Sequence, residues 1–347
     1  MYYSGLSLNE DHPTMTNPKL AHYYLDHHTG SLFINAHSIG LSAADRIQTG
    51  IIGKIHSIFQ RVINITVLEN HLISLVGEEI GHGSLNILVN FPTHINLTTM
   101  GIKVGDVVIR VGESIVVGPI VISTERTKIW KPRKNFKGNL QPIETIMSSL
   151  EVLRNVALAS DYLSGLGELI AFTCINGLKV SKTENLGSVA HIVLPHILEL
   201  LKAIKSGHSH NIIRITRHLI GLGPGLTPAA DDMLLGLMIS MFYISENFTE
   251  IRIDTKKINI DIVSPISGQT TIISEEFLRE ASIGNVNEPI ALLMENLLTS
   301  EKNIESSVRN VLSLGGTSGA DTVFGIILGS YLMLSSYFFV REDFKNF

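Results

Sequence analysis

The spacing of apolar residues changes once along this 347-residue chain, near residue 142. Before that point, short runs rich in Val, Ile and Thr recur between glycine-marked turns, which is typical of a small β-sandwich or barrel. The runs are residues 60–67, 71–76, 84–91, 106–111, 114–117 and 119–122. Beyond residue 142, apolar residues recur every three to four positions, which predicts α-helices. We therefore predict an α+β chain in which a β-rich domain precedes a helical bundle.

The helical part is expected to contain roughly eight helices, because most of its segments carry an apolar face. The helical segments are 144–159, 163–178, 189–204, 212–220, 233–244, 274–281, 288–298, 304–312 and a last apolar helix over 322–340. Residues 247–269 alternate charge with Ile and are interpreted as an excursion or a small hairpin. The predicted boundaries are an N-terminal extension (1–30), the β-rich domain (31–124), a basic linker (125–141) and the helical domain (142–347).

Charge disfavours nucleic acid as a partner. Residues 125–137 hold six Lys or Arg, but the whole chain has a net charge of −5, and aromatic residues make up only 6% of it. One short basic cluster releases few counterions, and sparse aromatics leave little for bases to stack on. We therefore interpret this segment as a solvated linker, with a nucleic-acid contact as the alternative.

Residues 322–340 are 19 consecutive residues without a charge, long enough to span a membrane. Serines within the run and the polar loop before it favour a buried bundle helix, and the 44% apolar content fits a large core. A transmembrane helix is the alternative. The start of the chain lacks a signal-peptide pattern, and Cys174 is the only cysteine, so we expect a cytoplasmic protein with a buried structural thiol.

Residues 221–232 read GLGPGLTPAADD, and a nearly all-apolar helix follows them. Thr227 before Pro228 is a strong helix start, because a residue before proline avoids the α region and proline suits the first helical position. Gly223 and Gly225 permit positive φ and a close approach of the backbone to a ligand. This first glycine turn therefore predicts a capped helix start with accessible backbone.

A second glycine turn, residues 315–321, reads GGTSGAD and also stands before an apolar helix. Its candidate ligand-binding residues are Gly316, Thr317 and Ser318. Two such helix starts that converge would form a polar pocket inside an apolar bundle, and exposed N–H groups at helix N-termini bind phosphate or carboxylate groups. Ordinary capping of two unrelated helices is the alternative.

Carboxylates complete the predicted site: Asp231, Asp232 and Asp321 are candidate catalytic residues, together with His218. Carboxylates repel an anion, so they must hold loop N–H groups, pair with a cation or bind a metal, and the sequence leaves these three roles open. The first turn lacks the Gly-Lys-Ser/Thr of a nucleotide P-loop, and no strand precedes it as a dinucleotide fingerprint requires.

Cationic side chains lie just before the first turn. Arg214 and Arg217 are candidate substrate-binding residues, and Arg214 shares a helix face with His218. They would neutralise a bound anion or a developing oxyanion, or serve as ordinary partners of a helix C-terminus. The 14 histidines include no His-Glu-x-x-His pattern and no Cys–His cluster, so we predict no metal site. The sequence requires no cofactor.

Four stretches of the chain resemble the AllH-like family: residues 56–64, the first glycine turn, residues 271–289 and the second glycine turn. The resemblance covers most of the chain, from about residue 31 to the last helix. The family pattern has Ser-Gly where this chain has Ala229 and Ala230, and His where it has Gly315.

The resemblance implies a subunit of oxamate carbamoyltransferase, which transfers a carbamoyl group between carbamoyl phosphate and the amide of oxamate in allantoin degradation. It also implies partner subunits that resemble FdrA and AllG. The predicted pocket suits a carbamoyl or acyl transfer, because a phosphate leaves, a small carboxylate binds and an oxyanion forms. The departures at Ala229, Ala230 and Gly315 keep a second hypothesis open, a non-catalytic subunit that binds a small anion or acts as a scaffold.

Overall fold

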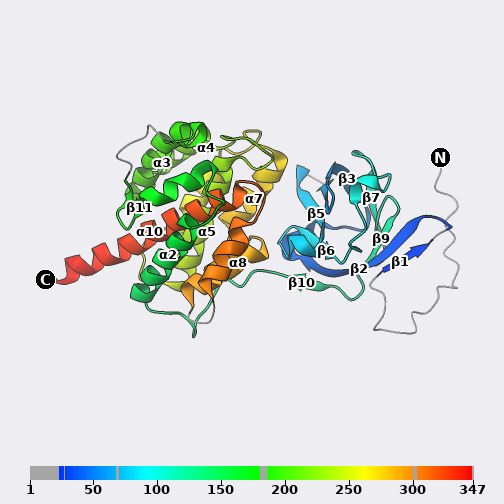
Figure 1. Ribbon diagram of the computed structural model, residues 1–347, viewed down its shortest axis with the longest axis horizontal. Helices are drawn as coiled ribbons and strands as arrows, with labels where there is room; N and C mark the ends of the chain where they lie inside the picture. The colour runs from blue at the N-terminus through cyan, green and yellow to red at the C-terminus, as the bar shows by residue number, and fades with distance from the viewer. Residues whose placement is uncertain (1–22, 27, 68–69, 180–185, 300–302, 346–347) are drawn as a thin grey trace.

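The computed structural model describes residues 23–26, 28–67, 70–179, 186–299 and 303–345, without the side chains of 339–345. A barrel-like domain and a helical domain lie next to each other along the long axis of the molecule, and the segment that contains β10 (Lys128–Trp130) runs between them (Figure 1). The predicted α+β architecture, with the β-rich domain first, is confirmed.

Eight of the described strands close into a barrel-like sheet, because β2 pairs with β6 on one side and with β9 on the other. Around the barrel the order is β2 (Ser31–Gly40), β6 (Asn86–Val89), β5 (Leu72–Gly77), β4 (Val62–Val67), β3 (Gly50–Ile58), β7 (Val107–Val111), β8 (Ser114–Val117) and β9 (Ile120–Ser123). Closure leaves these strands without an open edge. Alternate residues such as Ile63 and Ile65 fill the interior and are fully buried.

Two further strands lie outside the predicted β-rich range. β1 (Tyr23–Asp26) pairs antiparallel with β2 and falls within the predicted extension, and β10 pairs parallel with β2 and falls within the predicted basic linker. The sheet therefore extends beyond 31–124 at both ends.

The helical domain packs its other helices around a central pair, α5 and α10. Its helices are α2 (Ile143–Leu158), α3 (Ser188–Ser206), α4 (Ser209–Leu219), α5 (Ala229–Asn247), α6 (Thr255–Val263), α7 (Ile272–Ser282), α8 (Glu288–Leu298), α9 (Ile304–Leu312) and α10 (Ser318–Lys345). A short helix in the barrel domain, α1 (Leu41–Arg46), precedes β3.

Two of the expected segments were wrong. Residues 163–178 form a 3₁₀ helix, η4 (Gly165–Phe172), followed by a two-stranded turn, because Gly165 and Gly177 adopt positive φ and interrupt the α-helical path. Residues 247–269 contain α6 rather than a hairpin, because Ile258 and Ile262 lie four apart and are both buried.

Glycine contacts fix the direction of the central pair. Gly325 of α10 lies so close to the carbonyl oxygen of Met233 that a methyl group there would overlap it, and Gly329 lies in the same way against the carbonyl oxygen of Leu237. Contacts advance along both helices together, so α5 and α10 run parallel. Their N-termini, and the two glycine turns before them, therefore lie next to each other.

The apolar helix predicted over 322–340 is part of α10. Residues Ser318–Phe338 are long and apolar enough to cross a membrane, but 78% of the apolar window is buried inside the protein. Phe324, Ile327 and Tyr331 are completely buried. Such burial is typical of the core helix of a bundle.

The two domains meet through α7 and the start of α8. Arg46 of the barrel domain forms ion pairs with Glu276 (2.6 Å) and Glu280 (3.1 Å), which are both buried on α7. The N–H of Glu288 at the start of α8 donates to the carbonyl of His82 in the barrel domain at 2.8 Å. These contacts hold the barrel beside the glycine-turn region of the bundle.

Candidate functional site

The two predicted glycine turns meet at the adjacent starts of α5 and α10. The tips of both turns, around Gly225 and Gly316, are exposed to solvent. Gly223 (φ 118°) and Gly225 (φ 102°) occupy the left-handed side of backbone space, where a side chain would be strained. The backbone is therefore accessible at the mouth of the site.

Beneath the exposed tips, side-chain hydroxyl groups connect the two glycine turns. Thr227 Oγ1 and Ser318 Oγ lie 2.9 Å apart, although they are 91 residues apart in the chain. Both residues are half-buried, as is Thr317. A hydrogen bond between side chains of the two turns fixes their spacing.

Asp232 lies beneath these hydroxyls with only 6% of its surface exposed. Its Oδ2 atom has no hydrogen-bond partner among the described residues. Burial holds the pKa of this carboxyl well above its usual range, although hydrogen bonds from Ser318 and Thr227 act in the opposite direction. The nearby charges of Asp321 and Asp231 raise this pKa further.

Asp321 lies next to Asp232 at the start of α10 and is fully buried. Its Oδ1 accepts the backbone N–H of Leu166 at 2.6 Å, while Oδ2 has no partner among the described residues. Burial raises its pKa to about 7, against the opposing effect of hydrogen bonds from Leu166 and Thr317. Gly165 is required here, since a Cβ at this position would lie 2.5 Å from Asp321 Oδ1.

Asp231 has a different role, although it is the neighbour of Asp232. Its Oδ1 accepts the N–H of Gly221 at 2.8 Å, and its Oδ2 accepts the hydroxyls of Thr270 (2.5 Å) and Ser274 (2.6 Å). Burial raises its pKa, and these three hydrogen bonds oppose that rise. Asp231 therefore anchors the first glycine turn to α7, which is one of the three roles that the sequence left open.

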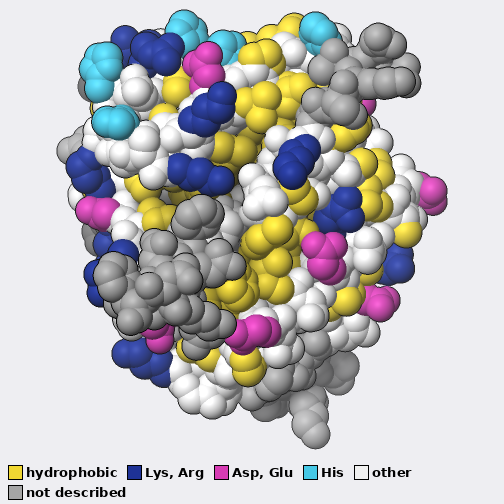
Figure 2. Space-filling model, turned by 90° about the vertical axis from the view of Figure 1, so that its left-hand side faces the viewer, with side chains coloured by type: hydrophobic (Ala, Val, Ile, Leu, Met, Phe, Trp, Pro, Cys, Tyr) yellow, Lys and Arg dark blue, Asp and Glu magenta, His cyan; other side chains and the backbone are white. Residues whose placement is uncertain are grey.

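The predicted cationic residues are not gathered around the buried carboxyls. Arg214, Arg217 and His218 are exposed on the outer face of α4. Arg214 pairs with Glu199 at 3.5 Å, and the ring of His218 stacks on His196 with centroids 5.6 Å apart. Figure 2 shows Lys, Arg and His side chains gathered on the upper part of this end of the helical domain.

Sequence reasoning missed the partners that hold the carboxyls. Leu166 belongs to a segment that was expected to be an ordinary helix, and Thr270 lies just after the expected excursion or hairpin, between two predicted elements. Ser274 had a signal, since it falls within the third family-like stretch. In the described part of the chain, no group of three or more His, Cys, Asp or Glu side chains is placed to hold a metal ion.

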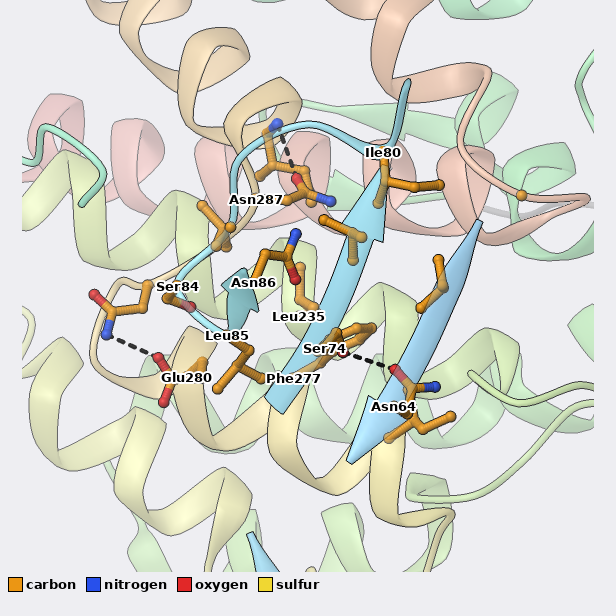
Figure 3. A pocket seen from close by; sticks show the side chains of 18 of the residues that line it. Asn64, Ser74, Ile80, Ser84, Leu85, Asn86, Leu235, Phe277, Glu280 and Asn287 are labelled. Carbon is orange, nitrogen blue, oxygen red and sulfur yellow. Dashed lines mark hydrogen bonds between the residues drawn. The ribbon is translucent and has the colours of Figure 1, made fainter. Parts of the chain in front are cut away.

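A cavity of about 440 Å³ lies between the barrel and the bundle, beside the glycine turns (Figure 3). All four family-like stretches contribute to its wall. Asn64 comes from the first stretch, Leu226 from the first glycine turn, Phe277 from the third stretch and Gly315 from the second glycine turn. The local periodicity of either domain could not predict it, because its wall forms only when the two domains meet.

Two protein-family models match the chain. The model described as the AllH family N-terminal domain matches residues 35–129, which form most of the barrel-like domain. The model described as oxamate carbamoyltransferase subunit AllH matches residues 219–330, which include both glycine turns and helices α5 to α9. No solved structure matches the chain. Because an N-terminal and a C-terminal model of one family match in order and together cover more than half of the residues, the chain belongs to the AllH family.

Proposed function

We propose that this chain is a subunit of an oxamate carbamoyltransferase-like enzyme and binds a small anionic substrate at the starts of α5 and α10. One observation carries the proposal: beneath two adjoining glycine turns, Asp232 and Asp321 each keep a buried carboxyl oxygen that has no hydrogen-bond partner in the described part of the chain. Capping alone does not account for these oxygens, because a buried polar atom without a partner destabilises the fold. The family description supplies carbamoyl transfer as the reaction class.

Two parallel helix starts favour an anion, because both present positive dipole ends to the same place. The raised pKa of Asp232 removes the main objection to an anion site beside this carboxyl. A carboxyl that keeps its proton carries no charge, so it does not repel phosphate and can donate a hydrogen bond to it.

The proposed reaction begins when the amide nitrogen of oxamate attacks the carbamoyl carbon of carbamoyl phosphate. The bond between that carbon and the phosphate oxygen breaks, and phosphate leaves with the electron pair. The nitrogen loses a proton to an ionised aspartate, and Asp321 suits this step because a pKa of about 7 allows proton uptake and release near neutral pH. The oxyanion is stabilised by the positive dipole ends of α5 and α10, which lie side by side.

Protein partners are part of the proposal, since the matching family model describes a subunit. We propose that FdrA-like and AllG-like chains complete the enzyme. The test therefore uses the reconstituted complex, with phosphate release from carbamoyl phosphate measured in the presence of oxamate. Asp321→Asn and Asp232→Asn should each lower kcat by about 100-fold or more, the usual range for loss of a general acid or base. Glu250→Gln, at an exposed carboxyl after α5, is the control and should leave kcat unchanged.

A second candidate is a non-catalytic subunit that binds the anion for a partner or acts as a scaffold. Ala229 and Ala230 are buried where the family pattern has Ser-Gly, so this position carries no hydroxyl group. The backbone of Gly223 packs directly against Ala229. Unchanged kcat in both aspartate variants would reject the catalytic proposal. If those variants instead bound carbamoyl phosphate more weakly while kcat at saturation stayed normal, the binding-subunit alternative would replace it.

A further inference from the structure

The cavity between the two domains has the properties of a small-molecule pocket. Its volume of about 440 Å³ lies within the usual range for ligand sites, and such sites favour domain interfaces. Most of its wall is apolar and includes Phe59, Val62, Ile80, Leu235 and Phe277. An apolar wall of this kind suits a ligand with a planar or compact apolar body.

The charge of the wall argues against an anion. Glu280 is the only ionisable side chain among the described residues that line the cavity, and no Lys, Arg or His is among them. Its carboxylate is already paired with Arg46 and accepts hydrogen bonds from Ser42 (2.6 Å) and Asn285 (2.9 Å). A phosphate or carboxylate in this cavity would therefore find no counter-charge, unlike an anion at the two helix starts.

Two amide side chains give the cavity its polar specificity. Asn86 is the first residue of β6 and Asn287 is the N-cap of α8, and Figure 3 shows both side chains at the pocket. Asn86 Nδ2 donates to the carbonyl of Gly81 at 3.1 Å, which leaves its Oδ1 without a partner among the described residues. Asn287 Oδ1 accepts the N–H of Ile290 at 3.3 Å, and its Nδ2 donates to no group of the residues that the structure describes.

The pocket thus offers the unused acceptor of Asn86 and the unused donor of Asn287 in a mostly apolar wall, whose one ionisable side chain among the described residues, Glu280, is already paired with Arg46. An amide or lactam group carries the complementary donor and acceptor. We propose that this cavity binds an uncharged ligand that has a planar apolar body and an amide or lactam group. Such a ligand differs in charge from the anion proposed for the helix starts, so this inference does not rest on the proposed function.

The test compares two probes of nearly the same shape, 4-fluorobenzamide and 4-fluorobenzoate, by fluorine NMR titration of the full chain. The amide should bind saturably and the carboxylate should not. Asn287→Ser keeps an N-cap hydroxyl but removes the unpaired amide, and should weaken 4-fluorobenzamide roughly tenfold. Phe277→Ala removes a partly exposed aromatic side chain from the cavity wall and should weaken the binding of 4-fluorobenzamide by a similar factor.

Asn303→Ser is the matched control. Asn303 is the N-cap of α9, its Oδ1 accepts the N–H of Ser306 at 3.3 Å, and it does not line the cavity. This variant should bind the amide probe like the unchanged chain, and so should Asp321→Asn, which separates this test from that of the proposed function. Thermal unfolding of each variant would verify that it is folded.

The proposal is overturned if both probes bind equally, if the amide shows no saturable binding, or if Asn287→Ser and Phe277→Ala both leave its affinity unchanged. It is also overturned if gel filtration shows a dimer that Phe277→Ala dissociates, since the cavity would then be an interface between two copies of the chain.

Discussion

Three aspartates lie near the glycine turns, and their carboxyl groups differ in how many hydrogen-bond donors they receive. Asp231 receives three donors and holds the first turn in place. Asp232 and Asp321 each keep one oxygen without a partner among the described residues, and burial favours their neutral forms. At the scale of single residues, the site therefore consists of one anchor and two groups that can still bind or exchange a proton.

The pKa of Asp321 makes the stability of the protein depend on pH. Its folded-state pKa of about 7 lies above the ordinary value of 3.8, so the folded state favours the protonated carboxyl. The stabilisation from this residue is complete below about pH 4 and is lost as pH rises through about 7. Asp321→Asn keeps an acceptor for the N–H of Leu166 but cannot ionise, and so should lack this loss.

Thermal unfolding at about pH 5 and about pH 8 checks this prediction. The melting temperature of Asp321→Asn, relative to that of the unchanged chain, should be higher at the alkaline pH by at least about 3 °C. Glu250→Gln should follow the unchanged chain at both pH values. Parallel curves for the aspartate variant and the unchanged chain would contradict the raised pKa.

The pairing of α5 with α10 is the element-scale feature that creates the site. Gly236 and Gly325 each stand four residues after an aspartate, and each packs against the backbone of the other helix. The same close contact that sets the helices parallel brings Asp232 and Asp321 together. Small residues on these two helices therefore have a positional role as well as a packing role.

The central contact predicts an unusual response to alanine. In an exposed helix, Gly→Ala adds about 1 kcal/mol of stability, but a methyl group on Gly325 would overlap the carbonyl of Met233. Gly325→Ala should therefore destabilise the protein by about 1–3 kcal/mol in chemical denaturation, the usual range for an overpacked core. Gly316→Ala, where a Cβ would meet no atom within 4 Å, should change stability by less than about 0.5 kcal/mol. Stabilisation by Gly325→Ala would show that the two helices are farther apart.

Much of this arrangement could be predicted because local patterns determine it. Short apolar runs between glycine-marked turns predicted six of the barrel strands, and the repeated order of glycine, hydroxyl and acid indicated a pair of related helix starts. Segments without a clear period failed: residues 163–178 are rich in apolar residues but glycines interrupt them, and α6 lies among alternating charges. The donor from Leu166 could not be predicted, since it lies 155 residues from the carboxyl that it serves.

At the scale of the whole molecule, one buried ion cluster connects the two domains. Arg46 pairs with both Glu276 and Glu280, and His71 Nδ1 lies 2.9 Å from Glu276 Oε1. The two carboxylates are almost completely buried, so Arg46 is their principal source of compensating charge. The barrel domain therefore supplies the positive charge that compensates the two buried carboxylates of α7. Helix α7 also forms part of the cavity wall and anchors Asp231 through Ser274.

Removal of Arg46 should thus affect the whole molecule rather than the barrel alone. Arg46→Met leaves two buried carboxylates without their cation and should cost about 3–5 kcal/mol, the usual range for a broken buried ion pair. Calorimetry should then resolve separate transitions for the barrel and the bundle, because the contact that couples their unfolding is lost. Arg133→Met is the matched control: its pair with Glu295 also joins the segment after β10 to the bundle, but the arginine side chain is 52% exposed, so the loss should stay below about 1 kcal/mol.

Charge removal on the other side of the cluster separates electrostatics from packing. Glu276→Gln and Glu280→Gln together, added to Arg46→Met, should recover part of the lost stability, because no buried charge then remains without a partner. They should also restore a single calorimetric transition if the cluster couples the domains by charge compensation. If Arg46→Met and Arg133→Met cost the same, or if the triple variant is no more stable than Arg46→Met, the domains must be held together by the apolar contacts around the cavity instead.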